Sequence, residues 1–192
     1  MAAHLPNLES FNITGCPKVT ERGIQCIVSA THSGLRSLGL ESVSSSFNMR
    51  AFAAFCVKHN SLKQLSSITL TLSRQLGSGV RDWAEAVVEL LSQSSLEKFN
   101  VYAASGGSIA ELWGREDLTG PSFSATAQWL WKEIARAHRH TLKRFSVLRF
   151  SMDVKTVEQV CRQCENLEEL FILAEFNWLV SKRSPFCPPF PC

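Results

Sequence analysis

The chain repeats one pattern of apolar positions six times, with an apolar residue at the first, fourth and sixth position of each copy. In every copy but the last, a polar residue or glycine stands between the fourth and sixth positions, as in a strand with one buried face. We therefore expect six short strands whose fourth and sixth residues point into the core. The copies lie at residues 8–13, 35–40, 65–70, 96–101, 142–147 and 167–172.

Apolar residues recur at helical spacing after each of the first five strands, so each strand should be followed by a helix. We expect Thr20 to be the N-cap of the first helix and Gly34 to end it in the left-handed conformation. The third helix should span about 80–92 and the fourth about 124–138. After the sixth copy no helical pattern follows.

The third copy can be read in two registers. A start at Leu62 would put the polar Ser67 at the sixth position, whereas a start at Leu65 puts Ile68 and Leu70 at the apolar positions. We prefer Leu65, because a shift of one residue turns every side chain of a strand to the other face.

The fourth copy is followed by an insertion at about 103–122, rich in glycine, serine and charge. Trp113 and Arg115 lie within it. Tryptophan and arginine are enriched at binding hot spots, but Trp113 could equally well pack the inserted loop onto the rest of the fold. The sequence leaves these two interpretations open.

A single strand–helix unit cannot bury its apolar face alone, whereas stacked units share a continuous core. The sequence thus predicts an α/β solenoid of about six strand–helix repeats over residues 1–180, curved into an arc with a parallel sheet on the concave side. The alternative is a doubly wound α/β domain, but no glycine-rich phosphate loop follows a strand. Residues 181–192 hold four prolines and are expected to form a disordered tail.

The composition suits an ordinary globular domain, with 45% hydrophobic and 19% charged residues among 192 and a formal net charge of +3. We expect no membrane span and no secretory signal. Seven cysteines without such a signal favour reduced thiols, hence the cytoplasm or the nucleus. Because the array starts inside a repeat and both sheet edges look uncapped, we expect it to derive from a longer repeat protein.

The stretch Gly15-Cys16-Pro17, continued by Val19-Thr20 and Gly23-Ile24, resembles the cysteine-containing, ribonuclease-inhibitor-like type of leucine-rich repeat. Cys164, three residues before Leu167, resembles the second cysteine of that repeat. His32 and His59 stand near the same place in two other copies, so the subtype is followed loosely. This type occurs in F-box proteins, and the resemblance implies substrate recognition for a ubiquitin ligase. No F-box pattern precedes the first repeat.

Two clusters could carry other chemistry. Cys161-x-x-Cys164 with His138 and His140 has the residue types of a zinc site, but the repeat pattern explains both cysteines without metal. The basic run at 132–149 could bind nucleic acid or an acidic partner. We favour its neutralisation by Glu168 and Glu169, which hold the same repeat positions as Lys143 and Arg144.

No catalytic motif is recognisable, so we interpret the chain as a non-enzymatic protein-interaction module without cofactor, metal or small-molecule substrate. Its partner would be a protein, and the resemblance to F-box proteins implies one that is ubiquitinated. The alternative is nucleic-acid or acidic-partner binding through 132–149. Outward strand residues and the insertion should supply the contacts. The candidate binding residues are Lys98, Asn100, Trp113, Arg115, Arg144 and Phe171.

Overall fold

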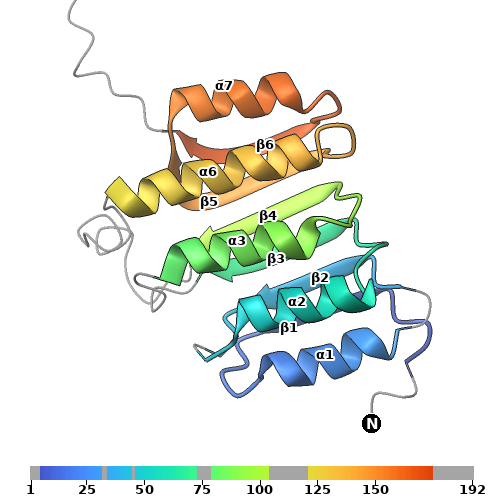
Figure 1. Cartoon of the computed structure of the whole chain (residues 1–192). Coiled ribbons are helices and arrows are strands. Elements are labelled where there is room, and N and C mark those ends of the chain that lie inside the picture. The colour runs from blue at the N-terminus through green and yellow to red at the C-terminus, as the bar shows by residue number, and fades with distance from the viewer. Residues whose placement is uncertain (1–4, 32–33, 45, 73–78, 104–120, 175–192) are drawn as a thin grey trace, which may run out of the picture.

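The computed structural model describes residues 5–31, 34–44, 46–72, 79–103 and 121–174. They form one sheet of six strands, each strand but the last followed by a helix (Figure 1). The strands are β1 (Ser10–Thr14), β2 (Ser37–Glu41), β3 (Ser67–Leu72), β4 (Lys98–Ala103), β5 (Arg144–Met152) and β6 (Glu169–Ala174). The helices are α1 (Glu21–Ser29), α2 (Met49–His59), α3 (Val80–Leu91), α6 (Pro121–Ala137) and α7 (Val154–Gln163).

The sheet follows the order of the sequence, β1-β2-β3-β4-β5-β6, and all five pairs are parallel. Figure 1 shows the helices side by side in front of the sheet, in the same order. A doubly wound sheet would instead reverse its strand order and carry helices on both faces. The predicted α/β class with a single parallel sheet is thus confirmed.

The repeated apolar positions form the core between the sheet and the helices. The fourth and sixth residues of neighbouring copies stand in register, for example Leu38 beside Ile68 and Leu40 beside Leu70. All four side chains are at most 1% exposed. Because Ile68 and Leu70, and not Ser67, hold the inward positions beside Leu38 and Leu40, the preferred register of the third copy is confirmed.

An aromatic cluster occupies the core under α6. The Trp131 ring lies edge-on to Phe99 and Phe145, with ring centroids 6.2 and 6.3 Å away. Phe150 lies 5.7 Å from the same ring. Leu130, also on α6, is 2% exposed and belongs to the same core.

The helix ends agree in part with the prediction. Thr20 holds the N-cap position of α1 but makes no side-chain capping bond, and α1 ends at Ser29 rather than at Gly34. Gly34 does adopt the left-handed conformation (φ 79°), but it lies in the loop before β2. Asn48 caps α2 by accepting from the Ala51 N–H at 2.9 Å, and a left-handed Asn60 ends it.

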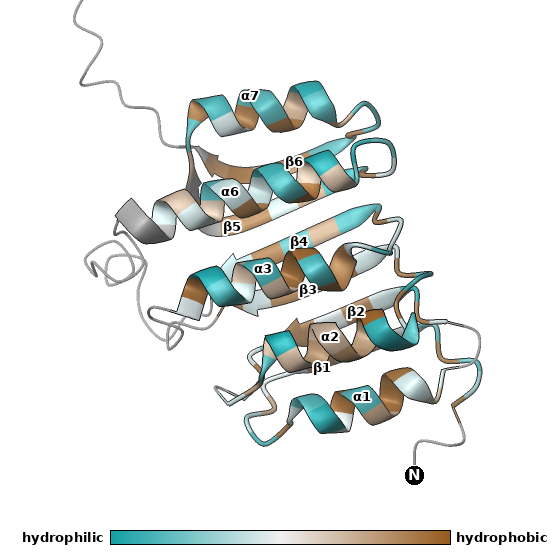
Figure 2. Cartoon of the chain, viewed as in Figure 1, coloured by the Kyte–Doolittle hydropathy of each residue, from teal (hydrophilic) through white to brown (hydrophobic). Residues whose placement is uncertain are grey.

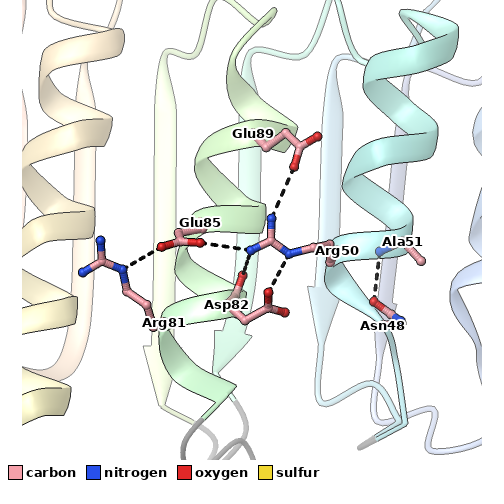
Figure 3. Close-up of polar contacts among 7 residues, drawn as sticks. All are labelled: Asn48, Arg50, Ala51, Arg81, Asp82, Glu85 and Glu89. Atoms are coloured by element: carbon pink, nitrogen blue, oxygen red, sulfur yellow. Dashed lines mark hydrogen bonds and ion pairs between the residues drawn. The ribbon is translucent and has the colours of Figure 1, made fainter.

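Polar bridges join neighbouring helices on the outer side. Arg50 of α2 reaches Asp82 at 2.6 Å, Glu85 at 3.1 Å and Glu89 at 3.8 Å on α3, while Arg81 holds the other oxygen of Glu85 (Figure 3). Figure 2 shows hydrophilic and hydrophobic residues in every helix, as expected of helices with one face on a sheet. The helix layer is therefore fixed by the core beneath it and by exposed ion pairs above it.

Candidate binding face on the open side of the sheet

No element that the structure describes covers the face of the sheet opposite the helices. We call this the open face. Parallel pairing places equivalent residues of the six strands in rows across this face. The first row is Ser10, Ser37, Ser67, Lys98, Arg144 and Glu169, and the second is Asn12, Gly39, Thr69, Asn100, Ser146 and Phe171.

The half of the open face formed by β1 to β3 is small and polar. The Asn12 side chain lies directly over Gly39, so that a β-carbon at position 39 would overlap it. Gly39 is consequently buried although it points to the open face. On the next strands the Asn100 amide lies 3.4 Å from the Thr69 hydroxyl, to which it donates. Hydroxyl and amide groups therefore line the open face across several strands. They can donate hydrogen bonds to the backbone of a bound segment and accept hydrogen bonds from it.

The half formed by β4 to β6 is larger, charged and apolar. Leu148 and Phe171, 42% and 48% exposed, are among the few large hydrophobic side chains on the surface of the described residues. Tyr102 stands in register with Leu148, and partial burial raises the pKa of its phenol. Lys98 is exposed and makes no ion pair with a described residue. Apolar anchors and an available cation on one half of a sheet are features of a protein interface.

Four of the six candidate binding residues, Lys98, Asn100, Arg144 and Phe171, meet on neighbouring strands of the open face. Trp113 and Arg115 lie outside the described residues, as do most of the insertion and the proline-rich tail.

Two of the predicted outward residues behave differently from simple exposed contacts. The Arg144 guanidinium pairs with Glu169 and lies 5.6 Å from the centre of the Phe171 ring, so its charge is already engaged. Ser146, which its repeat position turns to the open face, is only 6% exposed between the larger side chains of its row. Sequence reasoning missed Tyr102 and Leu148, since both stand beyond the six-residue pattern; continuing its alternation by two residues would have found them.

Three of the six basic residues in the run at 132–149 have a carboxylate partner: Arg136, Lys143 and Arg144. Arg144 pairs with Glu169 as expected, whereas Lys143 pairs with Glu97 of the preceding repeat at 3.3 Å instead of with Glu168. Arg136 holds Glu133 at 2.7 Å. The pairing of Arg144 was visible in the sequence because equal repeat positions lie side by side in parallel strands.

The cysteines and histidines near α7 occupy different environments. Cys161 is exposed, while Cys164 is buried with its thiol 3.8 Å from the Ala135 carbonyl. His140 is exposed beside Glu165, and His138 is buried. In the part of the chain that the structure describes, no three such ligands gather into a metal site.

Within the same part of the chain, no helix combines the length and the hydropathy required to span a membrane. Comparison of the chain with family models, with curated proteins and with solved structures finds no match.

Proposed function

We propose that the chain is a non-catalytic leucine-rich-repeat module that binds a protein partner on the open face of its sheet. The observation that carries the proposal is the character of this face. It is an uncovered sheet with polar rows on β1 to β3, and with Lys98 and the exposed Leu148 and Phe171 on the half formed by β4 to β6. Stacked strand–helix repeats use such an extended sheet as a rigid binding surface. On this proposal the sheet forms the concave side of a solenoid.

The resemblance of the repeats to those of F-box proteins makes the proposal more specific. The partner would be a protein delivered to a ubiquitin ligase, in the cytoplasm or the nucleus, and the module would recognise it without chemistry of its own. Sequential parallel strands with a one-sided helix layer support a repeat scaffold of this kind.

The alternative, nucleic-acid binding through residues 132–149, is less well supported. Lys143 and Arg144 each have a carboxylate within ion-pair distance, and binding phosphate would require both to give it up. A nucleic-acid interface would also lose affinity steeply with added salt. Little binding to nucleic acid at low salt is therefore expected.

A blocking substitution tests the proposed function. Thr69→Arg places a long side chain in the middle of the open face, and Ala54→Arg places the same side chain on the exposed side of α2 as a matched control. Proteins captured from a cell extract by the wild type should be retained by Ala54→Arg and lost by Thr69→Arg, at unchanged melting temperature. A ubiquitin-ligase adaptor among them would support the F-box relationship. Identical captured sets for all three chains would refute the open face as the binding surface.

A further inference from the structure

At β6 the described sheet ends with a backbone acceptor of a kind that every preceding repeat uses, and with an unpaired carboxylate beside it. Directly before the strands runs a row of residues that we call the entry row: Glu9, Arg36, Ser66, Glu97, Lys143 and Glu168. In each of the first five, the backbone carbonyl accepts two N–H groups from the next repeat. The Lys143 carbonyl, for example, accepts from Glu168 and Glu169 at 2.8 and 2.9 Å. The carbonyl of Glu168 has no such donor among the described residues.

The entry row contains two ion pairs between oppositely charged neighbours, separated by the neutral Ser66. Arg36 lies 3.8 Å from Glu9, and Lys143 lies 3.3 Å from Glu97. Glu168 is the last member; its exposed carboxylate makes no ion pair with a described residue. A further strand that continued the pattern would therefore place a cation beside Glu168.

The apolar side chains of β6 are also incompletely covered. Leu170 and Ile172 remain half-buried, whereas their register partners on β5, Phe145 and Val147, are 0% exposed. On the open face Phe171 and Leu173 are 48% and 40% exposed. The opposite edge strand, β1, presents only polar residues to the open face. The two edges thus differ, and the β6 edge has the surface that one more strand would bury.

We propose that the β6 edge binds an extended segment of another protein as a seventh parallel strand, with a lysine or arginine beside Glu168 and apolar side chains at the positions beside Leu170 and Ile172. Strand addition supplies affinity through backbone hydrogen bonds and specificity through alternate side chains. This edge is distinct from the open face, so the inference goes beyond the proposed function.

Charge selects this occupant over two others. A second copy of the chain, adding its β1 in the same register, would bring Glu9 beside Glu168 and set two carboxylates together. The chain's own residues 185–192 contain four prolines, which lack the N–H that the Glu168 carbonyl would accept. A segment of a different protein that begins with a basic residue avoids both conflicts and matches the charge of Glu168.

The test uses two blocked, fluorescein-labelled hexapeptides, Lys-Thr-Val-Thr-Ile-Thr and the same peptide with glutamate in first place, with the full-length chain at low ionic strength. We expect fluorescence anisotropy to show about fivefold tighter binding of the lysine peptide, as for an exposed ion pair. Glu168→Lys should reverse the preference. Glu41→Lys makes the same change on β2, four strands away from the β6 edge. It should leave the preference unchanged.

Hydrogen exchange locates the bound peptide. Amide protection should increase in residues 168–174 and remain the same in β1. Binding of neither peptide, a preference that Glu168→Lys does not reverse, or a preference altered by Glu41→Lys would each overturn the proposal. Partner capture on the open face should survive Glu168→Lys, so failure of this inference is distinguishable from failure of the proposed function.

Discussion

Acid should destabilise the fold through one buried histidine. The His138 side chain is only 4% exposed, and its Nδ1 accepts the Leu96 N–H at 3.4 Å. The proton of the neutral ring must then reside on Nε2, which has no hydrogen-bond partner among the described residues. Burial lowers the pKa of His138 from 6.5 to about 4. Protonation in the folded state would also cost the bond from Leu96, because both ring nitrogens would then be donors.

The sign of the pH effect follows from the lowered pKa. The unfolded chain takes up this proton near the ordinary value of 6.5, whereas the folded chain resists until the pH approaches about 4. Between these values the unfolded state binds more protons, so stability is full above the upper value and falls as the pH decreases. By about pH 4.5 the lost free energy of unfolding should reach roughly 2.5 kcal/mol.

The measurement is urea unfolding, followed by tryptophan fluorescence, near neutral pH and near pH 4.5, for the wild type and His138→Asn. The asparagine can still accept from Leu96 but does not titrate. Other acid-sensitive groups, such as Glu85, whose pKa is lowered by the guanidinium groups of Arg81 and Arg50, are common to both proteins and cancel. The wild type should lose the larger share of its stability; equal losses in the two proteins would refute the assignment to His138.

Three further predictions concern the core, the open face and the thiols. Trp131→Ala should lower the free energy of unfolding by about 3–5 kcal/mol, measured by chemical denaturation, since it empties the centre of the aromatic cluster. Gly39→Ala should cost about 1 kcal/mol by overlap with Asn12, and a double-mutant cycle with Asn12→Ala should recover most of it. Native-state alkylation with peptide mapping should modify the exposed Cys26 but not Cys56, because burial raises the pKa of Cys56 to about 12; equal labelling would contradict this.

Most of the fold could be predicted because one constraint recurs in every repeat. An apolar side chain at the fourth and sixth positions must face the helices, so the register of neighbouring strands follows from the sequence alone. Ile68 and Leu70, in register with Leu38 and Leu40, are the example. Helix ends were less predictable, since they depend on local bonds. Thr20 has a capping side chain that makes no bond, while Asn48, not singled out beforehand, makes one.

The candidate site was only partly predictable, for a related reason. The repeat fixes which residues point to the open face, and it correctly placed Lys98, Asn100 and Phe171 there. It does not fix what each side chain meets. Arg144 is held by Glu169, and Ser146 is covered by larger neighbours. Such outcomes depend on side-chain length and rotamer across strands, which a pattern of apolar positions does not encode.

The open face and the β6 edge differ in how much of each can be predicted from the sequence. The open face is a product of alternation and can be read from single strands. The β6 edge can be recognised only from the hydrogen bonds between strands. Each entry-row carbonyl accepts from the next repeat, and Glu168 is the last member of the row. Because that carbonyl and that carboxylate lie at one position, a partner strand must satisfy a hydrogen bond and a charge together. This joint requirement makes the edge more selective than its exposed apolar side chains alone would be.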